Sequence, residues 1–150
     1  MDYLYVDAST LVAIALDDPR RAQAALPMLA ASKHVGTSGL SLVECQAALS
    51  QELRDEPQLL VDAEQNLNRL LIRLQILAIA PAVLTQARHL VKRYRTSLGL
   101  RSADAIHVAT ANEVRDAIGE QGSRLIEYLT SDRRQHAAFT AEGYAGTFLP

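Results

Sequence analysis

Four acidic residues, spread widely along the chain, have the types and settings that could do chemistry: Asp7, Glu44, Asp104 and Asp132. Each follows an apolar strand-like run or opens a helix-like one, and such positions tend to meet at one edge of the sheet in an α/β fold. Carboxylates gathered without matching bases do not all stay ionised unless a cation joins them. Oxygen ligands of this kind suit Mg²⁺ or Mn²⁺. The four acids therefore indicate a divalent-metal site and phosphodiester chemistry.

Each acid also has a structural explanation, and the sequence leaves both alternatives open. Asp7 and Asp132 could each cap the helix that follows them. Residues 41–44 (SLVE) have the form of a capping box, in which Glu44 reaches back to the first amide of the helix. Asp104 lies in the first turn of a predicted helix, where the helix dipole favours negative charge. All four, however, lie in apolar surroundings, where an unpartnered carboxylate is costly.

The elements that must position these acids follow from the hydrophobic pattern and its breakers. The pattern predicts strands at residues 3–6, 34–37, 74–79, 125–129 and 144–149. Helices are predicted at residues 9–16, 20–31, 41–53, 59–71, 81–94 and 102–114. Strands that alternate with helices imply a parallel sheet in an α/β fold. No repeat or linker interrupts the pattern, so we expect a single domain over residues 1–150.

Composition limits the classes of protein that fit. Hydrophobic residues make up 49% of the 150 residues and aromatic residues only 5%, so the core must consist of Leu, Val, Ile and Ala. The formal net charge of -2 excludes disorder by charge repulsion and gives no general attraction for nucleic acid. Cys45, the one cysteine, cannot form an internal disulfide, which fits a reducing compartment. With no signal peptide and no apolar run long enough to cross a bilayer, we expect a cytoplasmic protein without a membrane partner.

The segments around the four acids resemble, in order, the motifs of the PIN-domain nucleases. The third, around Asp104, is the most specific, and the second, around Glu44, the weakest. In the first motif a hydroxyl, Ser9, follows Asp7 by two residues, and in the fourth a hydroxyl, Thr130, precedes Asp132 by two. The four segments are residues 5–11 (YVDASTL), 41–48 (SLVECQAA), 100–111 (LRSADAIHVATA) and 129–134 (LTSDRR).

Length and motif layout are most similar to the VapC-type toxins of prokaryotic toxin–antitoxin pairs. The resemblance implies a PIN-like three-layer sandwich, with a mostly parallel twisted sheet of four to five strands flanked by helices. It implies an Mg²⁺- or Mn²⁺-dependent ribonuclease, a homodimer and an antitoxin partner. It also implies that the four acids hold the metal and carry catalysis. Position 108, one turn past Asp104, is Val rather than a further acid, so one or two metals both stay open.

Secondary roles follow for residues beside the acids. Ser9 and Thr130 would support the metal ligands or touch the phosphate, although turn residues that bond only to backbone explain them equally well. Arg133, next to Asp132, is placed for phosphate contact. His107, three residues after Asp104, either bonds a ligating carboxylate or packs in the core.

Other functions stay open or lack support. A catalytically inert PIN-like binding module, or a metal-dependent nuclease outside any toxin–antitoxin pair, would share every feature above. A dehalogenase-type phosphatase would need a second Asp at position 9, which is Ser. A response-regulator receiver would need an Asp at the end of a central strand, where Ala80 and Pro81 follow the predicted strand instead.

Overall fold

Five parallel strands form the centre of the molecule. The computed structural model describes residues 2–118 and 126–150. The strand order is β3-β2-β1-β4-β5, and every neighbouring pair is parallel. The predicted α/β class with a parallel sheet is confirmed; residue 125, the first of the fourth predicted strand, lies outside the described residues. The bounds are Tyr3–Val6 for β1, His34–Ser38 for β2, Gln75–Leu77 for β3, Ile126–Thr130 for β4 and Ala145–Phe148 for β5.

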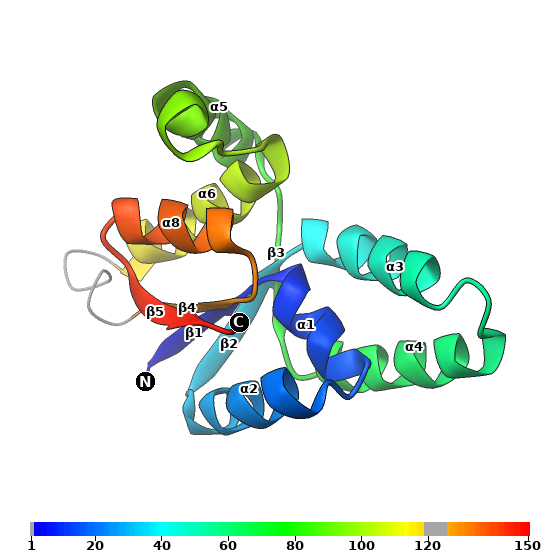
Figure 1. Ribbon diagram of the computed structural model, residues 1–150. Helices are drawn as coiled ribbons and strands as arrows, with labels where there is room; N and C mark the ends of the chain where they lie inside the picture. Colours follow the sequence, from blue (N-terminus) through cyan, green and yellow to red (C-terminus); the bar gives the residue numbers. More distant parts are fainter. Residues whose placement is uncertain (1, 119–125) are drawn as a thin grey trace.

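Helices cover both faces of this sheet and give the three layers (Figure 1). One face carries α1 (Ala8–Ala15), α2 (Pro19–Ala31), α3 (Leu40–Glu52) and α4 (Pro57–Leu71). The other carries α5 (Pro81–Leu98), α6 (Ser102–Ile118) and α8 (Arg133–Ala141). Within residues 2–118 and 126–150, none of these helices is long and apolar enough to cross a membrane.

Local sequence explains where several helices begin and end. Helices α2, α4 and α5 each begin with a proline, whose fixed φ and missing N–H suit the first helical position. Asp18 caps α2 by accepting the N–H groups of Arg20 and Arg21. Helix α5 runs to Leu98, four residues past its predicted end, and stops at Gly99, whose φ of 66° is the left-handed conformation of a helix cap.

The central strand β1 divides its side chains between two cores. Leu4 and Val6 pack with the helices α1–α4 on one face. Tyr3 and Tyr5 pack with α5, α6 and α8 on the other. All four side chains are buried, because β1 is flanked by strands on both sides and by helices on both faces. The strand therefore ends, at Asp7, in the middle of the molecule.

The order of the strands opens a crevice at this end of β1. The chain moves from β1 outward through β2 to β3, and then returns to place β4 on the opposite side of β1. The connections that follow β1 and β4 therefore lead to opposite faces of the sheet. In open α/β sheets, ligands bind at such a switch point, outside the carboxyl ends of the strands.

Gly146, in the edge strand β5, has no room for a side chain. A Cβ there would lie 2.5 Å from the backbone oxygen of Tyr128 and 2.4 Å from its ring. We expect Gly146→Ala to lower the free energy of unfolding by about 1–3 kcal/mol, the usual cost of overpacking, measured by urea denaturation. Gly39→Ala is the matched control, because its Cβ would meet only the Leu77 oxygen at 3.4 Å. Equal stability of the two variants would contradict the close packing of β5 on β4.

Candidate active site

All four predicted acids lie on one pocket of about 320 Å³ at the carboxyl edge of the sheet. Asp7 follows β1 directly, and Asp132 lies two residues beyond β4. Asp104 comes from the first turn of α6, and Glu44 comes from α3. Segments separated by up to 125 residues of sequence thus supply carboxylates to the same pocket, as their positions after strands and at helix starts predict.

Asp7 is the most enclosed of the four, with 1% of its surface exposed. Its side chain caps α1 by accepting the Thr10 N–H at 3.1 Å. Thr130 Oγ1 donates to Oδ2 at 2.6 Å, and Ser9 Oγ lies 2.8 and 2.9 Å from the two carboxylate oxygens. Burial raises the pKa of Asp7, and the nearby His107 and these hydrogen bonds oppose that rise. The carboxylate is therefore solvated by neutral donors of the protein.

The two hydroxyls bind backbone as well as the Asp7 carboxylate, so neither is a turn residue that bonds to backbone alone. Ser9 Oγ accepts the N–H of Ser131 at 2.8 Å, and Thr130 Oγ1 accepts the N–H of Asp132 at 2.9 Å. Each hydroxyl thus joins the Asp7 carboxylate to the turn that follows β4. This network fixes where the turn places Asp132 relative to Asp7.

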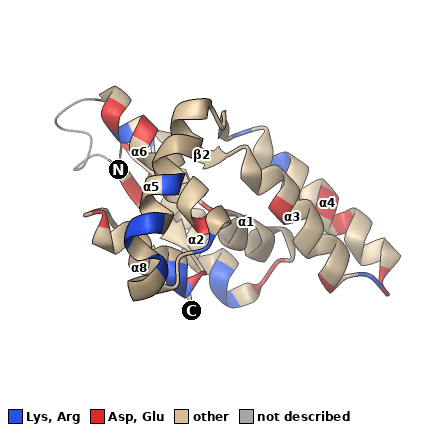
Figure 2. Cartoon of the chain, turned by 90° about the horizontal axis from the view of Figure 1, so that it is seen from above, with Lys and Arg blue, Asp and Glu red and all other residues tan. Residues whose placement is uncertain are grey.

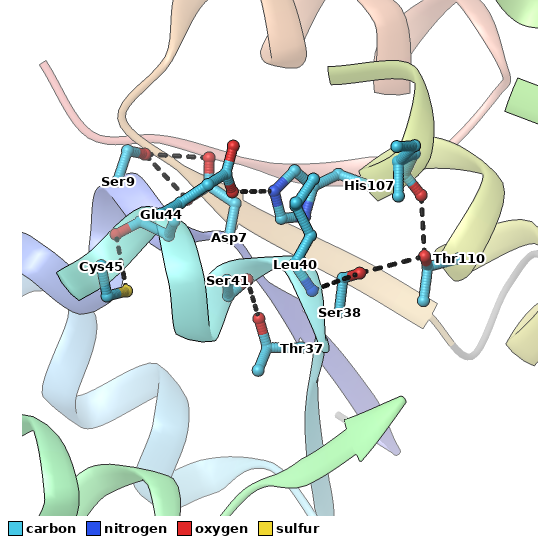
Figure 3. Close-up of polar contacts among 12 residues, drawn as sticks. Asp7, Ser9, Thr37, Ser38, Leu40, Ser41, Glu44, Cys45, His107 and Thr110 are labelled. Carbon is cyan, nitrogen blue, oxygen red and sulfur yellow. Dashed lines mark hydrogen bonds and ion pairs between the residues drawn. The ribbon is translucent and has the colours of Figure 1, made fainter. Parts of the chain in front are cut away.

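Glu44 reaches across the pocket to His107 (Figure 3). His107 Nε2 lies 2.6 Å from Glu44 Oε2, and its Nδ1 lies 2.7 Å from the hydroxyl of Tyr5. The imidazole is 2% exposed, whereas the Glu44 side chain is 31% exposed. Burial raises the pKa of Tyr5 well above its ordinary value, so the phenol keeps its proton. In a neutral imidazole this arrangement has Tyr5 O–H donating to Nδ1 and Nε2–H donating to Glu44.

The capping box predicted for residues 41–44 is wrong. Helix α3 begins at Leu40, and Gly39 at its N-cap makes no side-chain hydrogen bond. The Ser41 hydroxyl is instead paired with Thr37 Oγ1 at 2.6 Å, inside the fold (Figure 3). Because the helix starts two residues earlier than the box requires, Glu44 is free to extend into the pocket.

The remaining two acids are held by backbone amides. Asp104 Oδ2 accepts the Arg101 N–H at 3.0 Å, one residue before α6 begins. Asp132 caps α8, as predicted, by accepting the N–H of Arg134 at 2.7 Å and that of Gln135 at 3.2 Å. Burial raises the pKa of Asp104, and the negative charge of Asp132 adds to the rise. The two carboxylates therefore interact electrostatically across the pocket.

The chemistry of this donor set fits a hard divalent cation. The pocket is lined by four carboxylates, and two of them, Asp7 and Asp104, have raised pKa values that a cation would lower. In the arrangement described for residues 2–118 and 126–150, no three His, Cys, Asp or Glu side chains are disposed to hold a metal ion. The Asp7 oxygens are engaged by hydroxyls instead.

Among the polar residues that line the pocket, the sequence did not indicate two. Arg21 comes from α2, and its Nε donates to the Pro150 carbonyl at 3.1 Å. Gln135 comes from the first turn of α8. Arg133, expected to contact phosphate, does not line the pocket; its guanidinium lies 6.0 Å over the ring of Phe148. Gln135 could have been found from the sequence, because it lies three residues after Asp132 in the first turn of the helix that Asp132 caps. Nothing near Arg21 in the sequence connects it with the acids.

A profile of the PIN domain matches residues 4–139, which include all four acids and almost the whole fold. The chain belongs to the PIN-domain family. Members of this family are nucleases, and the match confirms the resemblance that the four motifs indicate. A search of curated proteins gives no match.

Several solved structures share the fold. A protein of Pyrobaculum aerophilum is 23% identical, with a TM-score of 0.59, over 97% of this chain and 83% of that one. VapBC2 from Rickettsia felis, bound to a DNA fragment from its promoter, is 12% identical, with a TM-score of 0.64, over 99% of each chain. A toxin–antitoxin complex from Klebsiella pneumoniae is 19% identical, with a TM-score of 0.61, over 89% and 90%.

The raised pKa of Asp104 makes its negative charge destabilising at neutral pH. A folded-state pKa above the ordinary 3.8 means that the folded protein holds this proton more tightly, so stability falls as pH rises through that window. We expect Asp104→Asn to raise the thermal unfolding midpoint at pH 7 in metal-free buffer. This rise in the unfolding midpoint should vanish below pH 3.8, the ordinary pKa of the carboxyl, because wild-type Asp104 is then uncharged, like the asparagine. A lower midpoint at pH 7 would contradict this.

Proposed function

We propose that this protein is a divalent-metal-dependent ribonuclease that hydrolyses RNA phosphodiester bonds. The observation that carries the proposal is the convergence of Asp7, Glu44, Asp104 and Asp132 on one pocket, in a chain of the PIN-domain family. Four carboxylates supply oxygen ligands of the kind that Mg²⁺ and Mn²⁺ prefer. Single-stranded RNA segments, whose backbone is accessible, suit a pocket at the carboxyl edge of the sheet.

The residues of the pocket have different proposed roles, which follow from their positions. Asp7, Asp104 and Asp132 would hold the metal, directly or through water, and a bound metal would lower the pKa of water and neutralise phosphate oxygens. Glu44 completes the ligand set or orients the attacking water, and His107 fixes its direction by the 2.6 Å contact. Ser9 and Thr130 hold the Asp7 carboxylate in place. A buried, oriented carboxylate then needs little rearrangement to act.

A place in a toxin–antitoxin module is the finer proposal. The Rickettsia felis and Klebsiella pneumoniae neighbours are toxin–antitoxin complexes of the same fold. We infer a VapC-type toxin that acts in the cytoplasm as a homodimer, with an antitoxin that covers the acidic pocket. An inert PIN-like binding module, or a nuclease outside such a pair, is the alternative. Co-expression with the product of the neighbouring reading frame, followed by co-purification and relief of growth arrest, tests the pairing.

Removal of one central carboxylate should abolish cleavage without unfolding the protein. We expect Asp104→Asn to reduce Mn²⁺-dependent cleavage of a mixed-sequence RNA by roughly 100-fold or more, because a metal ion supplies several kcal/mol of stabilisation to the transition state. Asp62→Asn, on the exposed face of α4, is the control and should cleave as the wild type does. Full metal-dependent cleavage by folded Asp104→Asn protein would defeat the proposed site.

The Thr130 hydroxyl should act through Asp7. Thr130→Val removes the donor to Asp7 Oδ2 and the acceptor for the Asp132 N–H, so both ligands lose their orientation. We expect the Mn²⁺ concentration for half-maximal activity to rise by about 10–100-fold. Thr85→Val is the matched control, because among the described residues that hydroxyl bonds only to the Pro81 carbonyl, on the exposed face of α5. An unchanged Mn²⁺ requirement in Thr130→Val would show that the hydroxyl serves the fold alone.

A further inference from the structure

Gln135 carries a buried amide group that the fold leaves without a partner. The residue is 3% exposed, and it lines the pocket together with the four acids. Its side-chain Nε2 has no hydrogen-bond partner among residues 2–118 and 126–150. Buried amide donors are almost always paired, and an unpaired one destabilises a folded protein by the full cost of its desolvation. A polar group held at this cost, beside a pocket, points to an acceptor that arrives with a ligand.

Several acceptors of the pocket are already engaged by other donors. Asp132 Oδ1 takes the backbone N–H of Gln135, and both Asp7 oxygens face the hydroxyls of Ser9 and Thr130. Glu44 Oε2 is bound to His107. The Nε2 donor of Gln135 pairs with none of these oxygens, so it stays available to an acceptor on a bound ligand.

The first turn of α8 fixes the backbone position from which this donor extends. Asp132 caps the helix, and the Thr130 hydroxyl fixes the Asp132 amide in turn. Gln135 is the third residue of α8, directly above this cap. The backbone of Gln135 is therefore held by the same network that positions two of the acids, Asp7 and Asp132.

The charges around the pocket favour a phosphate as the acceptor. Arg21 lines the same pocket, and the positive charge of Arg134 acts on Asp104. Figure 2 shows further basic positions on α8 and close to the C-terminus. Arginine and amide donors together are typical of contacts to a nucleic-acid backbone. We propose that Gln135 Nε2 donates a hydrogen bond to a non-bridging phosphate oxygen of RNA bound in the acidic pocket, a role that rests on the proposed function.

Gln135→Leu tests this directly, because leucine fills a similar volume and removes both amide atoms. We expect a fluorescein-labelled 12-mer RNA to bind the variant about tenfold more weakly than the wild type, by anisotropy in Ca²⁺ buffer, as for a lost hydrogen bond to a charged group. In the absence of RNA, the variant should unfold at a higher temperature, because the orphaned donor is gone. A purely structural glutamine would give the opposite shift in the unfolding temperature.

The chain offers a matched control in Gln86, on α5. Its Oε1 is also buried without a partner among the described residues, but it does not line the acidic pocket. Gln86→Leu should therefore raise the unfolding temperature and leave RNA binding unchanged. Equal loss of RNA binding in both variants, or unchanged binding in Gln135→Leu, would overturn the proposal.

Two further measurements separate the possible failures. A DNA 12-mer of the same sequence should lose affinity for Gln135→Leu by the same factor as RNA; a loss for RNA alone would assign the contact to the 2′-hydroxyl and overturn the phosphate assignment. Cleavage by the wild type in Mn²⁺ is scored separately. Binding that depends on Gln135 without cleavage would defeat the proposed ribonuclease and keep the contact, whereas a wild type that binds no RNA would defeat both.

Discussion

The fold places a carboxylate, Asp7, at the end of its central strand, where water does not reach it. Strands flank β1 on both sides and helices cover both faces, so the position is enclosed by the architecture itself. No Lys or Arg of the described residues makes an ion pair with Asp7; Ser9, Thr10 and Thr130 provide neutral donors instead. A buried charge held in this way is costly. Much of the local structure, from the α1 cap to the turn after β4, supplies hydrogen bonds that offset the cost of burying the Asp7 carboxylate.

The same carboxylate lies where two separate cores meet. One core joins β1 to the helices α1–α4, and the other joins it to α5, α6 and α8. The acidic pocket draws residues from both sides: Glu44 from the first group of helices, Asp104 and Asp132 from the second. The contact between Glu44 and His107 connects the two groups across the pocket. The spacing of the acids is therefore set by the packing of both cores.

Much of this arrangement could be predicted from the sequence, because apolar strands and helix breakers give the order of elements and the order gives a parallel sheet. The acids after β1 and β4 could be placed at one edge on that basis. The capping box around Glu44 was predicted wrongly, because its serine pairs instead with Thr37, a contact from the preceding strand. Arg21 reaches the pocket through packing between distant segments. No local pattern encodes such contacts, and the orphaned amide of Gln135 is defined only by what surrounds it.

The two edge strands of the sheet are short, with three residues in β3 and four in β5. A strand of that length presents few free backbone groups, and proteins commonly limit unwanted strand pairing in this way. Extension of the sheet by another polypeptide would therefore gain only a few hydrogen bonds. The helices that cover the two faces therefore offer a protein partner more contact surface than the sheet edges do.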